Sequence, residues 1–249
     1  MGQQSITRKD DGSECIPGQN LPWTNWVAAT ETRNYCKADP LLDWLDLYGE
    51  NGGFTPDYKQ SSYDSRTDYT RFILGKGKDF QTTVLAHLCK QLQVVTISTG
   101  PQTALDRACA EATWNALSDG VEVVSGGVLW NPQNQTFGVA DLIVRSDVLN
   151  KLFPGMLTSG EEREMAPDIP NARWHYRIIE IKYKKLKLCK DGHFTTEAAS
   201  LALVVQSCMY NEMLGRLQGY RPGAAYLLGR SCELDRDHRG WSARAPSLR

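Results

Sequence analysis

Hydrophobic and polar positions repeat first at helical spacing and later at the spacing of extended strands. Between Asp79 and Gln93, apolar residues recur every three or four positions, which predicts an amphipathic helix. A second such stretch runs from Thr103 to Leu117 and is closed by Gly120. A third and longer one, from Ala198 to Leu217, predicts another helix. The chain therefore has at least three candidate helices that could cover a sheet.

Between and after these helices the period changes to that of strands. "VEVVSGGVLWN", "FGVADLIVRS" and "YRIIEIKYKKLKL" predict three strands, and the turn-forming "NPQNQ" joins the first two. "VVTIS" and "GAAYLLG" predict two shorter strands. The segment from Asp147 to Arg173 reads as an inserted loop with one helical turn. Neighbouring strands with a short connection indicate an antiparallel meander, so we expect an α/β protein with a central mixed sheet flanked by helices.

The first part of the chain has a different composition. Residues 1–20 are polar and predicted to be flexible, residues 21–48 are rich in Trp and Leu, and residues 49–70 read as a long loop. Asp39 and Pro40 are expected to open a helix that Gly49 ends. We expect a mainly helical lobe with its loop over residues 21–75, a core over 76–232, and a tail over 233–249 that is disordered or continues into something longer.

Composition and charge exclude several classes of protein. The 249 residues are 41% hydrophobic and 23% charged with a net charge of −1, so no global basic field marks a histone-like binder. No apolar run approaches the roughly 20 residues that span a membrane, and no signal-peptide core opens the chain. We expect a soluble intracellular protein, cytoplasmic or nuclear in a host cell. Seven cysteines without a CxxC pair indicate reduced thiols and give weak support to a zinc or iron–sulfur site.

The stretch "HYRIIEIKYKKLKL" places two charges on an apolar strand. Because side chains alternate between faces, Glu180 and Lys182 point the same way. Asp141 lies in "GVADLIV" on the preceding strand, so antiparallel pairing can bring two carboxylates together, where a cation would offset their repulsion. Two hard oxygen ligands suit Mg²⁺ or Mn²⁺. A purely structural salt-bridge cluster would explain the same residues.

The order of these motifs resembles the RecB-like branch of the PD-(D/E)XK nuclease superfamily, which includes phage recombination exonucleases and CRISPR-adaptation nucleases. The matching motifs are "GVAD" ending at Asp141, "EIK" from Glu180 to Lys182, and "QSCMY" from Gln206 to Tyr210. The resemblance covers roughly residues 76–229 and implies a restriction-endonuclease-like core. It also implies that Asp141, Glu180 and the carbonyl of Ile181 bind the metal. Lys182 would then assist the attacking water or the phosphate, and Gln206 and Tyr210 would steady Lys182 and the nucleic-acid backbone.

One position departs from that family. Its members usually carry another Glu or a His on the first core helix, where this chain has Gln81, whose carbonyl oxygen can still ligate a metal. Three possibilities stay open: one metal rather than two, a substitute acid such as Asp79 or Glu111, or an impaired site. His87 does not occupy that helical position.

Partner residues can also be named from the sequence. Five basic residues are candidates for phosphate contacts, although a solvated basic surface would look the same: Lys184, Lys185, Lys187, Arg216 and Arg221. Trp23, Trp26 and Tyr35 could stack on unpaired bases, or they could form the core of the first lobe.

The sequence thus predicts a divalent-metal-dependent deoxyribonuclease of phage or viral type, exonuclease-like, that acts on single-stranded DNA or duplex ends. The alternatives are a catalytically impaired, nuclease-derived module that binds DNA or acts as a scaffold, and an interaction protein whose charged pairs are purely structural. The oligomeric state is not predicted.

Overall fold

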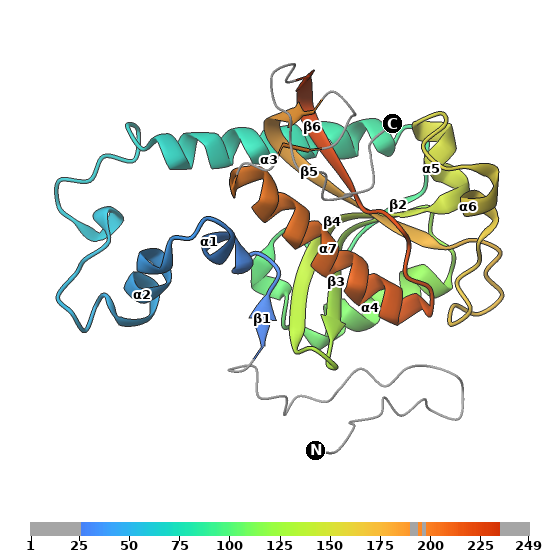
Figure 1. Ribbon diagram of the computed structural model, residues 1–249, viewed down its shortest axis with the longest axis horizontal. Coiled ribbons are helices and arrows are strands. Elements are labelled where there is room, and N and C mark those ends of the chain that lie inside the picture. Colours follow the sequence, from blue (N-terminus) through green and yellow to red (C-terminus); the bar gives the residue numbers. More distant parts are fainter. Residues whose placement is uncertain (1–25, 190–193, 196–197, 235–249) are drawn as a thin grey trace.

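The computed structural model describes residues 26–189, 194–195 and 198–234, and it shows a curled mixed sheet packed against helices (Figure 1). The five strands of the main path lie in the order β2–β3–β4–β5–β6. Their bounds are Val94–Thr96, Val123–Asn131, Thr136–Arg145, Tyr176–Leu188 and Tyr226–Leu234. Strands β3, β4 and β5 form the predicted antiparallel meander, whereas β2 and β6 pair in parallel with β3 and β5. The predicted α/β class with a mixed sheet is confirmed.

Helices cover both faces of this sheet. In chain order the α-helices are α1 Thr32–Cys36, α2 Pro40–Tyr48, α3 Tyr69–Leu88, α4 Arg107–Ser118, α5 Ser146–Leu152, α6 Ser159–Arg163 and α7 Ala198–Gln218. Short 3₁₀ turns occur at Asp57–Lys59 (η2) and Pro101–Thr103 (η3). Side chains of α4 and α7 pack into the core on one face, and those of α3 and α5 into the core on the other. Figure 1 shows α7 crossing one face while α3 passes behind the sheet.

Strand β5 contributes to both cores because its side chains alternate. Tyr176 and Ile178 join the cluster under α7, whereas Ile179 and Ile181 join the cluster under α3. All four are buried, and burying a side chain of this size is worth about 1.5–3 kcal/mol. Glu180 shares the face of Ile178, so the hydrophobic pattern of this strand fixes the direction in which its charged residues point.

Two segments from the N-terminal part of the chain attach to this core in different ways. The short strand β1, Val27–Ala28, pairs in parallel with the start of β4, and α1 packs against α7. Helix α2 has no buried residue. In Figure 1, α2 and the first half of α3 both project away from the sheet. The helix predicted between Pro40 and Gly49 and the helical character of this segment are confirmed. Every helix within the described ranges is too short or too polar to cross a membrane.

The prediction for α3 was wrong at its start. The helix begins at Tyr69, ten residues before the predicted start. Asp68 is its N-cap, and the Asp68 side chain accepts a hydrogen bond from the backbone N–H of Arg71. The early turns were missed because most of their side chains face solvent, and without a buried stripe they lack the periodicity that marks the later turns. These turns also contain Gly75 and Gly77, which lower the intrinsic helix propensity.

Other boundaries also differ from the predictions. Helix α4 begins at Arg107, after a 3₁₀ turn, and ends before Gly120, whose φ of +72° suits a residue without Cβ. The inserted segment contains two short helices, α5 and α6, rather than one turn. Strand β6 runs to Leu234, so the predicted tail begins inside a strand; residues 1–20 and the rest of that tail lie outside the described residues.

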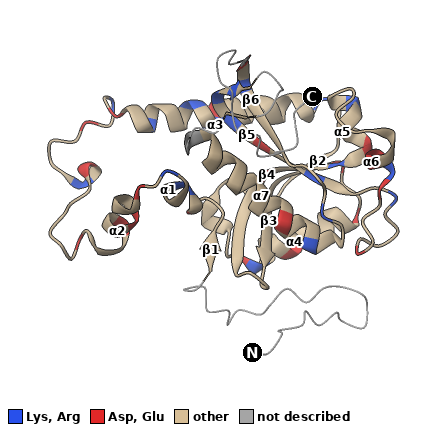
Figure 2. Cartoon of the chain, viewed as in Figure 1, with Lys and Arg blue, Asp and Glu red and all other residues tan. Residues whose placement is uncertain are grey.

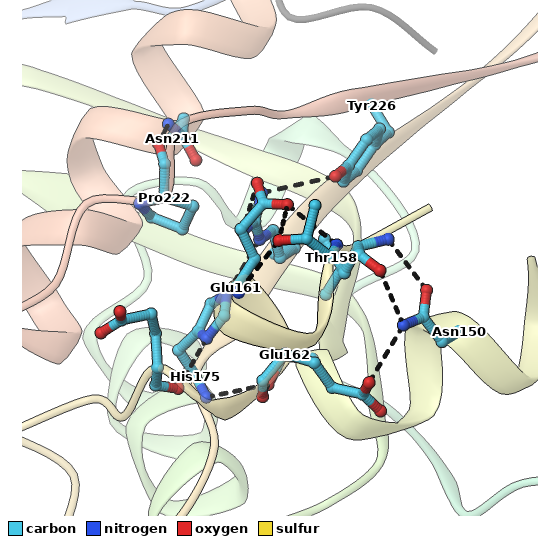
Figure 3. Close-up of polar contacts among 12 residues, drawn as sticks. Asn150, Thr158, Glu161, Glu162, His175, Asn211, Pro222 and Tyr226 are labelled. Carbon is cyan, nitrogen blue, oxygen red and sulfur yellow. Dashed lines mark hydrogen bonds and ion pairs between the residues drawn. The ribbon is translucent and has the colours of Figure 1, made fainter. Parts of the chain in front are cut away.

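A buried polar cluster fastens the inserted segment to the sheet (Figure 3). The fully buried guanidinium of Arg177 donates from Nε to Nε2 of His175 at 2.8 Å, and Nδ1 of His175 lies 2.8 Å from the carbonyl of Glu164. Glu161 lies 3.6 Å from Nη2 of Arg177 and closes the capping box of α6 with Thr158. The contacts of Glu161 and Glu164 with the start of β5 join separate segments of the chain, and the hydrophobic periodicity of the sequence does not predict them.

Candidate functional site

The candidate site lies where β4 and β5 separate. The two strands pair from Arg145↔Tyr176 to Leu142↔Ile179, and the next expected pair, Asp141 with Glu180, is not part of the ladder. Further along, the same edge of β4 pairs instead with β1, at Thr136 and Phe137. Backbone groups at this opening must find other partners, since unpaired buried ones are costly. Side chains of Asp141 and Glu180 provide them.

Each carboxylate accepts a backbone hydrogen bond from the opposite strand. Oδ2 of Asp141 accepts from the N–H of Ile181 at 2.8 Å, and Oε1 of Glu180 accepts from the N–H of Asp141 at 3.2 Å. In an extended strand the N–H and C=O of one residue point to the same side. The carbonyl of Ile181 therefore faces the same opening. Two carboxylates and one carbonyl thus converge on it.

Glu180 is a buried carboxyl group in contact with Lys182. Its side chain is 1% exposed, and Oε2 accepts a hydrogen bond from Nζ of Lys182 at 2.8 Å. Burial and the nearby charge of Asp141 raise the pKa of Glu180, and together they outweigh the opposing effect of Lys182. Burial lowers the pKa of Lys182, but the charges of Glu180 and Asp141 outweigh it, so the net shift is upward and the ammonium is retained. A further cation would offset the electrostatic repulsion between the carboxylates of Glu180 and Asp141.

Helix α7 reaches the site with the two residues predicted from the sequence. Nε2 of Gln206 lies 3.4 Å from Oε2 of Glu180 and donates to the hydroxyl of Tyr210 at 3.1 Å. These residues are one helical turn apart, and Tyr210 is buried, which raises the pKa of its hydroxyl. Gly138 leaves room for the ring, since a Cβ there would lie 2.5 Å from Cε1 of Tyr210. The helix thus holds Glu180 from one face of the sheet.

Helix α3 reaches the site from the other face through Gln81. Its Nε2 donates to Oδ1 of Asp141 at 3.1 Å. The two substitute acids proposed from the sequence lie elsewhere: Asp79 is 75% exposed next to Lys76, and Glu111 pairs with Arg107 on α4. His87 is exposed and lies 3.3 Å from the side chain of Gln91. Gln81 is therefore the residue of the first core helix that faces the carboxylates.

The structure brings together the six predicted residues of the site core. These are Gln81, Asp141, Glu180, Lys182, Gln206 and Tyr210, with the backbone of Ile181 between them. The part of the chain that the structure describes holds no group of three or more His, Cys, Asp or Glu side chains able to bind a metal. Two carboxylates with one backbone carbonyl are nonetheless a donor set that Mg²⁺ accepts, because this ion keeps several of its waters.

The predicted phosphate-binding residues fall into two places. Lys184, Lys185 and Lys187 lie on β5 just beyond the site, and Lys185 pairs with Glu233 at 2.8 Å. Arg216 lies ten residues after Gln206 on α7, about 15 Å along the helix, and Arg221 pairs with Glu212. Figure 2 shows basic and acidic segments interspersed over the described chain. Only the three lysines lie on a strand of the site.

The aromatic residues considered for base stacking differ in their exposure to solvent. Trp26 is 7% exposed and packs in a core cluster with Val128 and Trp130, so the core interpretation is correct for this residue. Tyr35 on α1 is 86% exposed. Trp23 lies outside the described residues.

Sequence reasoning missed the reason for the geometry. The backbone hydrogen bonds between Asp141, Glu180 and Ile181 depend on the separation of β4 from β5, and no local sequence pattern predicts that separation.

Comparisons with protein-family models, curated proteins and solved structures find no significant match. The chemistry of the site therefore rests on its residues and their contacts.

Proposed function

We propose that this protein is a divalent-metal-dependent nuclease that hydrolyses phosphodiester bonds in DNA. The observation that carries the proposal is the pair of carboxylates of Asp141 and Glu180 in the opening between two strands, with Lys182 bonded to one of them. Neutral Asn and Gln side chains could accept the backbone hydrogen bonds at this gap equally well, so a purely structural role would not need two carboxylates side by side. The arrangement agrees with the resemblance to RecB-like PD-(D/E)XK nucleases and with a restriction-endonuclease-like core.

The residues of the site have separate roles in this proposal. A Mg²⁺ or Mn²⁺ ion held by Asp141, Glu180 and the carbonyl of Ile181 would supply an activated water and neutralise phosphate charge. Lys182 keeps a positive charge beside Glu180 and stabilises the negative charge that develops on the phosphate. In the reaction, a water oxygen would lose a proton to solvent and bond to phosphorus, the bond from phosphorus to the leaving oxygen would break, and the leaving oxygen would take up a proton from solvent.

The surrounding residues position this group. Gln206 contacts Glu180 and Tyr210, so it holds the carboxylate in place from α7. Lys184, Lys185 and Lys187 lie beyond the site on the same strand, where they would bind the DNA backbone with salt-dependent affinity. The single-stranded or duplex-end substrate and an exonuclease-like action are part of the proposal, as is a cytoplasmic or nuclear location in a host cell.

Cleavage assays with linear duplex and single-stranded DNA test the proposal. With Mn²⁺ or Mg²⁺ the wild-type protein should cleave, and Asp141→Asn and Lys182→Ala should each reduce the rate about a hundredfold or more. Lys151→Ala removes a lysine from the exposed surface of α5 and should leave the rate unchanged. Equal rates in the wild type, Asp141→Asn and Lys182→Ala would assign the activity to a contaminant and refute the proposal.

One observation favours a second candidate, an impaired nuclease-derived module that binds DNA. Gln81 occupies the position next to Asp141 where the resemblance implies an acid or a histidine. Such a module would bind DNA with a salt-dependent affinity that Lys184→Ala and Lys187→Ala weaken, but it would not cleave with either ion. Appearance of cleavage in Gln81→Glu alone would support this candidate over the first.

A further inference from the structure

The side chain next to Asp141 on α3 is the neutral amide of Gln81, which adds no negative charge to the site. Gln81 approaches from α3 and donates from Nε2 to Oδ1 of Asp141 at 3.1 Å. Oδ2 of the same carboxylate accepts from the N–H of Ile181 at 2.8 Å. Asp141 is therefore held on both oxygens, and the group beside it on α3 is a neutral amide.

Neither of the two candidate acids takes the place that Gln81 leaves uncharged. Asp79 points to solvent beside Lys76, and Glu111 pairs with Arg107. Among the described residues no group of three or more His, Cys, Asp or Glu side chains is arranged to hold a metal ion. Within the part of the chain that the structure describes, the charged groups in contact at the site are the carboxylates of Asp141 and Glu180 and the ammonium of Lys182.

With both carboxylates ionised, as metal ligands must be, the charges of these groups add to −1, from two carboxylates and one ammonium. One divalent ion would bring the site to +1, which matches the single negative charge of a phosphodiester. Two ions would bring it to +3 without a third carboxylate to separate them, and like charges at close range repel strongly in a poorly solvated site. We infer that the site binds one divalent cation and that Gln81 sets this number; the inference rests on the proposed metal-dependent function.

Gln81 acts as a positioning residue in this arrangement. Its amide hydrogen bond fixes the direction of the Asp141 carboxylate, and removal of such a partner commonly weakens metal binding about tenfold to a hundredfold. Replacing the amide by a carboxylate, as in Gln81→Glu, gives a third acid beside Asp141 and a total charge of −2. That charge and that extra pair of oxygens are what a second divalent ion needs.

Binding of Mn²⁺ itself, counted by electron paramagnetic resonance of the free ion, tests the inference without an activity assay. The titration uses the full chain alone and with a nuclease-resistant phosphorothioate oligonucleotide. The wild type should bind one Mn²⁺ and Gln81→Glu should bind two. Gln81→Met, which keeps the length but loses the amide, should bind one Mn²⁺ about tenfold or more weakly. Thr82→Glu adds the same charge to the exposed neighbouring position and should match the wild type.

The outcomes separate the inference from the proposed function. One ion in the wild type and two in Gln81→Glu support the inference. Two ions in the wild type, or one in Gln81→Glu, overturn it and leave a metal-dependent nuclease in place. Absence of binding in the wild type overturns both. If Gln81→Glu does not fold, an unchanged affinity in Gln81→Met overturns the positioning role, and a weakened single site supports it.

Discussion

Replacing Gly138 with Ala should destabilise the protein through Tyr210. An added Cβ would lie 2.5 Å from Cε1 of the Tyr210 ring and 3.4 Å from Cβ of Ala29. Carbon atoms in contact normally lie about 3.5–4.0 Å apart, so the ring must move by about 1 Å. Tyr210 is 2% exposed and bonded to Gln206, which leaves the ring little freedom to move. The added methyl group therefore acts on the site as well as on the core.

The expected cost follows from three contributions. Overpacking of a buried position costs about 1–3 kcal/mol. Loss of the hydrogen bond between Gln206 and Tyr210 would add about 1 kcal/mol. Replacing Gly with Ala restricts the unfolded chain and returns about 0.4–1 kcal/mol. The free energy of unfolding should therefore fall by about 1–3.5 kcal/mol, because the packing penalty and the lost hydrogen bond exceed the entropic gain.

Urea unfolding followed by circular dichroism measures this difference. Gly77→Ala is a matched control, since it lies in helix α3 with nothing within 4 Å of the added Cβ, and it should stabilise the protein by up to about 1 kcal/mol. In a Tyr210→Leu background the ring is absent, so the cost of Gly138→Ala should largely vanish. A Gly138→Ala protein as stable as the wild type, or an equal cost in both backgrounds, would refute the reasoning.

Three further changes have defined outcomes. Burial lowers the pKa of His175 from 6.5 to about 4, so the folded protein binds this proton more weakly than the unfolded chain, and stability is lost as pH falls from 6.5 towards 4. Between about pH 7.5 and about pH 5 the wild type should lose about 2 kcal/mol more than His175→Gln in urea unfolding; parallel curves would contradict this. Tyr176→Phe should lose about 1–2 kcal/mol, because its buried hydroxyl donates to the carbonyl of Val121 at 2.9 Å, whereas Tyr69→Phe at an exposed position should lose nothing measurable. Lys182→Met leaves Glu180 buried without its cation, and thermal melts should show a loss that grows as pH rises through the raised pKa of Glu180; a loss independent of pH would rule out this cause.

The long elements with a buried apolar side could be predicted from the sequence. Helix α7, the three strands of the meander and the helix that Pro40 opens all lie where the pattern of apolar residues or a capping signal placed them. The early turns of α3 and the helices of the inserted segment could not be predicted in this way. The former face solvent. Helix α5 packs through Leu149 but is too short to show a helical period, and α6 has no buried residue and is held by the contact of Glu161 with Arg177.

The residue types of the site and their faces were determined by the sequence itself. Strand alternation places Glu180 and Lys182 on one face, and helical spacing places Gln206 and Tyr210 one turn apart, whatever the rest of the fold does. The position of Gln81 on an amphipathic helix was also readable. For these residues, the local periodicity is sufficient to predict the face on which each side chain lies, because the backbone geometry of a strand or helix sets it without any tertiary contact.

Only the tertiary structure decided which groups touch. The separation of β4 from β5 leaves backbone N–H groups whose hydrogen bonds the side chains of Asp141 and Glu180 accept. Packing of α3 on the sheet places Gln81, and not Asp79, against Asp141, while Glu111 lies on α4 and pairs with Arg107. The same packing buries Trp26 and leaves Arg216 one long helix segment away from the carboxylates. Distances between elements far apart in the chain arise from packing of their side chains, which the local pattern does not encode.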